Sequence, residues 1–130
     1  MLLSAYNDQW SNASAYGYAT FKAYGTTLTG NVIVGDTCLS SACSTRDQAS
    51  TAAIYLYQDS AGTASKLIGA INTADTGKTV SLTLDAASKW VVTGTSYLTA
   101  LADADSTYSN ITCQTSGCAV YVNGTEIAIN

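Results

Sequence analysis

The stretch from 79 to 101, TVSLTLDAASKWVVTGTSYLTAL, contains three short runs of strand-forming residues and no helical spacing. In its first run, residues 79–84, apolar and hydroxyl side chains alternate with the period of a half-buried strand. The four residues 85–88 then interrupt the alternation as a turn does. Strands this short cannot bury their apolar side chains alone. The stretch therefore predicts an all-β chain whose short strands pack against strands from other parts of the sequence.

A loose repeat extends this pattern along the chain. Four segments share the order apolar, small or polar, glycine, two spacers, apolar, and their glycines are Gly30, Gly69, Gly94 and Gly124. The intervals of 39, 25 and 30 residues are irregular, but they lie in the range that indicates a solenoid with insertions. Stacked coils would bury one continuous column of side chains, with Trp90 inside it and glycine at the corners.

We therefore predict a β-solenoid over residues 26–130, preceded by an aromatic segment at 1–25. An antiparallel β-sandwich built from the same strands remains open. It requires hairpin turns, for which Asn123-Gly124 is the one two-residue signal.

Composition excludes several classes of partner. Only 11% of residues are charged, the formal charge is −4, and the five basic residues are scattered along the sequence. Nucleic-acid binding needs clustered cations, so we do not expect it. No apolar stretch is long enough for a membrane span. The N-terminus does not read as a signal peptide, which favours a mature fragment or a processed subunit.

Four cysteines form two pairs with the same spacing, Cys38/Cys43 and Cys113/Cys118. A four-cysteine zinc site is possible with this set, but the sequence contains no histidine, and zinc ribbons use shorter spacings. We favour two local disulfides, each of which would pin a turn. Disulfides predict an extracellular or cell-surface location. Glycosylation sequons at Asn12, Asn110 and Asn123 agree weakly with secretion.

Aromatic residues gather in two places. Tyr55 and Tyr57 alternate with Ile54 and Leu56, so we expect the two tyrosines on the outer face of a strand, where rings can stack on sugars. Residues 1–25 are either a strand or cap on the end of the domain, or an aromatic contact for a second subunit or a ligand. Their candidate self-association residues are Tyr6, Trp10, Tyr16, Tyr18, Phe21 and Tyr24.

The second half of the chain resembles a group of secreted right-handed parallel β-helix proteins that bind carbohydrate. The resemblance covers roughly half the chain and is carried by the segments LIGAIN (67–72), VSLTLD (80–85), SKWVVTG (88–94), SYLTAL (96–101) and VYVNGT (120–125). It implies a fold like that of polysaccharide lyases, with coils like those of bacterial adhesins. It also implies polysaccharide binding, in some members with bound calcium. The chain is shorter than a usual member, and the paired cysteine loops are not part of the pattern.

Candidate catalytic groups are few. Without histidine, a phosphate loop or a cation within an acidic cluster, the sequence does not favour an enzyme. Asp75, Asp103 and Asp105 are candidate calcium ligands, or turn formers that bond their own backbone.

We therefore expect an extracellular, non-catalytic module that binds polysaccharide or acts as an adhesin. The alternative is a subunit that polymerises with copies of itself into an extracellular filament or surface layer.

Overall fold

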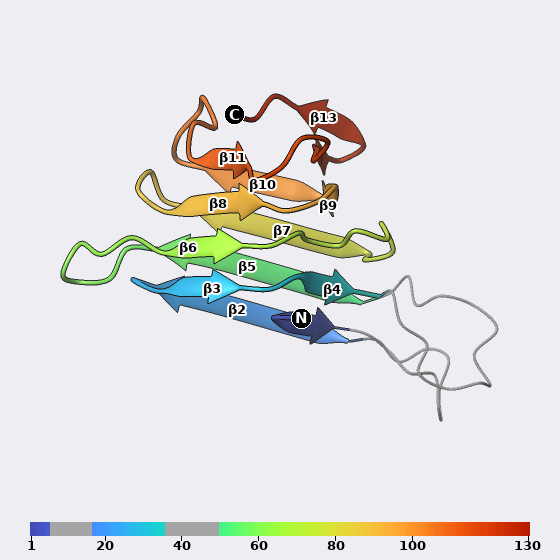
Figure 1. The fold of residues 1–130 in the computed structure, drawn as a ribbon. Helices are drawn as coiled ribbons and strands as arrows, with labels where there is room; N and C mark the ends of the chain where they lie inside the picture. Colours follow the sequence, from blue (N-terminus) through green and yellow to red (C-terminus); the bar gives the residue numbers. More distant parts are fainter. Residues whose placement is uncertain (6–16, 36–49) are drawn as a thin grey trace.

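The computed structural model describes residues 1–5, 17–35 and 50–130, and this part of the chain is all-β, with thirteen strands and no helix (Figure 1). The strands are β1 (Leu3–Ala5), β2 (Tyr18–Tyr24), β3 (Thr27–Thr29), β4 (Val32–Val34), β5 (Thr51–Tyr57), β6 (Lys66–Ile68), β7 (Thr79–Leu84), β8 (Lys89–Val92), β9 (Ser96–Leu98), β10 (Ala100–Asp103), β11 (Ile111–Cys113), β12 (Val120–Val122) and β13 (Thr125–Ile127). It follows that no described helix is long and apolar enough to cross a membrane.

Two four-stranded sheets form the body of the molecule. Their strand orders are β2-β5-β7-β10 and β3-β6-β8-β11, and every neighbouring pair in them is parallel. Each passage of the chain thus adds one strand to each sheet, and the layers rise from the N-terminus to the C-terminus (Figure 1). The antiparallel β-sandwich that the sequence left open does not describe these sheets, because their strands run parallel.

Shorter strands lie on a third side of the molecule. The pairs β1–β4 and β9–β12 are parallel, and an isolated bridge joins Val32 to Ile71. The last strand differs, since β13 pairs with β12 in the antiparallel sense. Asn123, with φ 50°, and Gly124, with φ 77°, make the turn between them, so the hairpin signal is confirmed there.

The interior follows from the alternation within the strands. In β7, Val80, Leu82 and Leu84 are buried, while Ser81 and Thr83 lie on the outer side and are half-buried. In β5 the same period buries Ile54 and Leu56. The predicted inward residues of both strands are confirmed.

Register aligns these side chains into rows across the layers. One row contains Leu28, Leu67, Trp90 and Ile111, from β3, β6, β8 and β11. Trp90 is fully buried, as predicted, and its Nε1 donates a hydrogen bond to the carbonyl of Gly69 at 2.9 Å. The indole therefore fills the interior without leaving its polar atom unpaired.

A glycine permits the close approach of two layers at one corner. A Cβ atom on Gly69 would collide with the carbonyl oxygen of Gly30 in the layer below. Gly30 itself has φ 134°, which side chains rarely adopt. The first two glycines of the repeat are thus required by packing and backbone geometry.

Candidate functional site: an outward tyrosine face

The outer side of β2 and β5 carries the densest group of aromatic side chains in the described residues. Alternation turns Lys22 and Tyr24 of β2 away from the interior, and does the same for Tyr55 and Tyr57 of β5. The parallel register then places Lys22 beside Tyr55 and Tyr24 beside Tyr57. We call these four residues the tyrosine face.

The three rings of the tyrosine face form a connected cluster. Ring centroids are 5.7 Å apart for Tyr24 and Tyr57, and 6.0 Å apart for Tyr55 and Tyr57. The Nζ atom of Lys22 lies 5.3 Å from the centroid of the Tyr55 ring, within cation–π range. Cross-strand packing therefore limits the rotamers of these side chains before any ligand binds.

Exposure decides what this face can do. Tyr24 is 55% exposed and Tyr18, further along β2, is 72% exposed, whereas Tyr55 and Tyr57 are half-buried. Large aromatic rings in contact with solvent provide apolar area and a hydroxyl group at low entropic cost. Such a surface can bind by stacking and hydrogen bonding.

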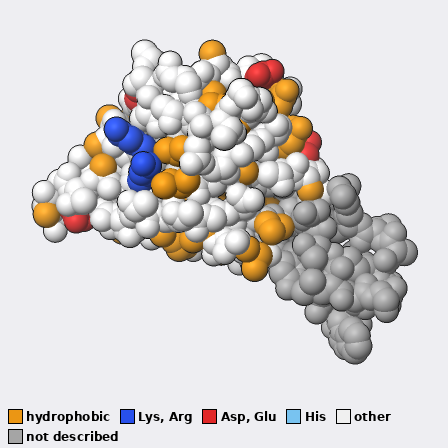
Figure 2. Space-filling model, in the orientation of Figure 1, with side chains coloured by type: hydrophobic (Ala, Val, Ile, Leu, Met, Phe, Trp, Pro, Cys, Tyr) orange, Lys and Arg blue, Asp and Glu red, His pale blue; other side chains and the backbone are white. Residues whose placement is uncertain are grey.

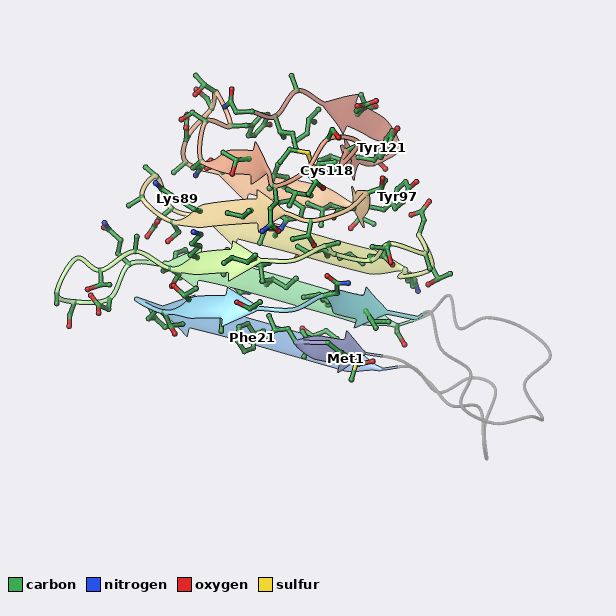
Figure 3. The ribbon with its side chains drawn as sticks, in the orientation of Figure 1. Met1, Phe21, Lys89, Tyr97, Cys118 and Tyr121 are labelled. Atoms are coloured by element: carbon green, nitrogen blue, oxygen red, sulfur yellow. A yellow bond between two sulfur atoms is a disulfide. The ribbon has the colours of Figure 1, made fainter. Side chains whose placement is uncertain are left out.

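The predicted aromatic residues of the N-terminal segment separate in the structure. Tyr18 and Tyr24 lie on the outer side of β2, but Phe21 points inward and packs against the core (Figure 3). Phe21 is therefore partly buried against the core, and its role in self-association stays a prediction. Tyr6, Trp10 and Tyr16 lie outside the described residues.

The segment boundary predicted at residue 25 falls between two consecutive strands, β2 and β3, of the layered structure. β2, within the predicted N-terminal segment, pairs with β5 over seven residues, while β3 begins directly after the boundary. Residues 18–24 thus form an edge strand of a four-stranded sheet.

A second aromatic pair was not singled out from the sequence. The rings of Tyr97 in β9 and Tyr121 in β12 stack at 5.1 Å with an interplanar angle of 13° (Figure 3). The negative charge of Glu126 raises the pKa of the exposed Tyr121 hydroxyl. In the sequence, each tyrosine lies in the middle of a short strand-forming run, SYL or VYV. That pattern could predict two outward tyrosines, but only the strand register shows that their rings are neighbours.

The three candidate calcium ligands do not form one group. Asp103 and Asp105 are adjacent, with the Asp105 N–H donating to Asp103 Oδ1 at 2.9 Å, but the described residues contain no cluster of three potential acidic, histidine or cysteine ligands. Asp75 lies in a separate turn with φ 53°.

Asp105 acts as a turn former in its own loop. Its carboxylate accepts hydrogen bonds from the side chains and backbone N–H groups of Thr107 and Ser109. The side-chain bonds from Ser109 and Thr107 lower the pKa of Asp105 to about 2. This carboxylate is therefore already satisfied by the protein.

Two oxygen atoms near this loop have no partner. Asp103 Oδ2 and Asn110 Oδ1 are both buried and unpaired, while Asn110 Nδ2 donates to Asp103 Oδ1 at 3.0 Å and to the Ser88 carbonyl at 3.1 Å. These are the described oxygens that best suit a water molecule or a small hard cation. The same contacts bury Asn110, so the sequon there is inaccessible, in contrast to the exposed Asn123.

One cysteine pair is present in the described residues. Cys113, the last residue of β11, forms a disulfide with Cys118 at a Cα–Cα distance of 6.0 Å. Cys38 and Cys43 lie outside the described residues.

The comparisons with known proteins add no family. No family model, no curated protein and no solved structure matches this chain.

Proposed function

We propose that this chain is an extracellular, non-catalytic module that binds polysaccharide through the tyrosine face. The observation that carries the proposal is the cluster of Tyr24, Tyr55 and Tyr57 on the outer side of two paired strands, with centroid spacings of 5.7 and 6.0 Å. Sugar rings present C–H groups that pack on aromatic rings, and hydroxyl groups that pair with tyrosine and threonine. The disulfide is compatible with an extracellular location.

We further propose that the layered sheets are a short right-handed parallel β-helix. The supporting observation is that β2, β5, β7 and β10 follow the same order as β3, β6, β8 and β11. In such a solenoid, each coil adds one row to a flat outer face, which is a suitable surface for an extended polymer. An adhesin would use the same face against a glycan on a cell surface.

Affinity electrophoresis through gels containing hydroxyethylcellulose, xyloglucan or galactomannan tests the proposal. We expect at least one of these polymers to retard the protein. The double substitution Tyr55→Ala/Tyr57→Ala should weaken that retardation about thirtyfold, because two aromatic contacts together contribute on the order of 2 kcal/mol.

Tyr97→Ala/Tyr121→Ala is the matched control, because it removes an equivalent ring pair from another side of the molecule. It should leave retardation unchanged. Equal loss in both variants, or unchanged binding in the first, would contradict the role of the tyrosine face. Hydrolysis or cleavage of a retained polymer by the pure protein would contradict a non-catalytic module.

Self-assembly into a filament or surface layer is the second candidate function. It is favoured by one observation, which is that β2 and β3 carry no strand on their outer edges among the described residues. Unpaired strand edges can add strands from another molecule. Size-exclusion chromatography with negative-stain microscopy distinguishes the two functions, since concentration-dependent fibres support assembly and a stable monomer contradicts it.

A further inference from the structure

The second sheet brings together two lysines that are distant in the sequence. Lys66 opens β6 and Lys89 opens β8, and the register pairs them directly as neighbours. Adjacent parallel strands are about 4.8 Å apart. Figure 3 labels Lys89 beside β8, and Figure 2 shows blue side chains together on the same side of the molecule. These two of the five basic residues are thus neighbours in space.

This pair places two positive charges on neighbouring strands. Like charges directly opposite each other on neighbouring strands destabilise a sheet. The described residues place no carboxylate in an ion pair with either lysine. A surface that holds two cations side by side, in a chain with a formal charge of −4, is complementary to an anionic ligand.

The acidic residues in the preceding turns are engaged elsewhere. Asp59, in the turn before β6, accepts hydrogen bonds from the N–H groups of Ala61 and Thr63 at 2.9 and 2.8 Å. Asp85, before β8, accepts from the N–H groups of Gln58 and Ser88 at 2.6 and 2.7 Å. The Asp59 carboxylate therefore holds its own turn, and the Asp85 carboxylate joins its own turn to the one that follows β5.

The surroundings of the pair suit a sugar polymer. The next outward row beside the lysines contains Ile68 and Val91, which are register partners and half-buried, and Figure 2 shows orange side chains next to the blue ones. Thr27 lies beside Lys66 on the other neighbouring strand. Apolar side chains can contact the C–H side of a sugar ring, while the ammonium groups contact its charged substituents. Two cations are few for nucleic acid, which requires more phosphate contacts.

We infer that Lys66 and Lys89 form a subsite for the acidic groups of an anionic polysaccharide. This inference rests on the proposed function and deepens it, because it names the class of polymer that the module prefers. The lysine pair lies on the β3-β6-β8-β11 sheet and the tyrosine face on the other sheet, so one polymer reaches both by passing the corner at residues 58–65, where Ser65 bonds the carbonyl of Tyr57. Each ammonium group would pair with a carboxylate or sulfate group on the polymer chain.

Carboxymethylcellulose and hydroxyethylcellulose separate this inference from the proposed function, since they share a glucan backbone and differ in charge. The wild-type protein should bind carboxymethylcellulose more tightly at low salt, and salt should remove the preference. Lys66→Gln/Lys89→Gln should weaken binding to carboxymethylcellulose about tenfold and leave binding to hydroxyethylcellulose unchanged. Cellulose sulfate, tested in parallel, distinguishes sulfate from carboxylate as the preferred group.

Two further variants make the result specific. Lys66→Arg/Lys89→Arg keeps the charges and should retain the preference, and Lys78→Gln removes an exposed lysine from another position and should have little effect. Circular dichroism and thermal unfolding check that each variant folds. Equal binding of the double glutamine variant, or an equal loss in Lys78→Gln, would overturn the subsite. So would lysine-dependent binding to duplex DNA without binding to either anionic polymer. If hydroxyethylcellulose binds through the tyrosines without any charge preference, only this inference fails.

Discussion

The two ends of the layered sheets differ in the strands that cover them. At the C-terminal end, β13 folds back on β12, and Asn130 exchanges backbone hydrogen bonds with β11 through Cys113 and Ile111. Ile127 and Ile129 pack against the core there. At the N-terminal end, β2 and β3 have no strand on their outer edges among the described residues, and Phe21 and Leu28 are only partly buried.

The difference shows how a layered β structure ends. Parallel layers can be extended indefinitely unless something interrupts the pattern. Here an antiparallel turn at Asn123-Gly124, a short disulfide loop and a terminal backbone pairing interrupt it on one side. The described residues contain no comparable antiparallel strand at the other end. β10 also has no strand on its outer edge among the described residues, so the hairpin and Asn130 cover this end over β12 and β11 only. A head-to-tail filament would therefore have to form around the C-terminal hairpin or displace it.

The largest expected loss of stability comes from a substitution in the middle layers, where each strand packs between two others. Leu82→Asp places a charge at a fully buried position between Ile54 and Leu101. We expect loss of the folded state, because a buried unpaired carboxylate costs several kcal/mol. Thr83→Asp, one residue on and facing outward, should be mild. Urea unfolding followed by circular dichroism compares them, and equal damage would show that the alternation is wrong.

The next effect compares the same residue type at the end and in the middle of one row. Leu67→Ala should cost about 4 kcal/mol of unfolding free energy, because this side chain is fully buried between two layers. Leu28→Ala, its register partner in the end strand, should cost about half of that or less, because Leu28 is already partly exposed. The same urea experiment measures both. Equal losses would mean that something covers the N-terminal end in solution.

A smaller effect concerns the disulfide of the closed end. Reduction of Cys113–Cys118 should cost about 2 kcal/mol, because a loop with a sequence separation of 5 constrains the unfolded chain little. Hydrogen exchange should show the loss of protection in β11, β12 and β13, with β2 and β5 unchanged. Loss of protection throughout the chain would contradict a local role for this loop. Mass spectrometry without reduction should find no free thiol at Cys38 or Cys43 either.

The smallest effect is a dependence on pH near the same end. Hydrogen bonds lower the pKa of Asp105 from 3.8 to about 2, so its ionised form is favoured by folding. A lowered pKa contributes stability that is present above the unfolded value and is lost as the pH falls from about 3.8 to about 2. Asp105→Asn should flatten the pH dependence of the melting temperature in this window. An unchanged profile would contradict a role for this carboxylate in the loop.

Much of the fold followed from local patterns in the sequence. Alternation was sufficient to identify the inward residues of β5 and β7, and the bulk of Trp90 was sufficient to place it inside. These assignments need only the period of a strand and the preference of large apolar groups for the interior. The positions of Tyr55 and Tyr57 on the outer side followed from the same period.

Contacts between layers could not be predicted in this way. Lys66 and Lys89 become neighbours only because the turns before β6 and β8 bring both strands into the same register. The repeated Ser-Lys pairs at 65–66 and 88–89 were a visible signal, since both serines are buried at the corner and Ser65 N–H donates to Ser88 Oγ. The inward side of Phe21 was not predicted either, because aromatic clustering in the sequence does not specify the side of a strand.

The central claim, that polysaccharide binds on the tyrosine face, is tested most directly by NMR titration with cello-oligosaccharides and the polymer found to bind best. The account predicts that ring signals of Tyr24, Tyr55 and Tyr57 shift together and saturably, while those of Tyr97 and Tyr121 do not change. Shifts confined to Tyr97 and Tyr121, or no shift in any tyrosine while binding is observed, would contradict it.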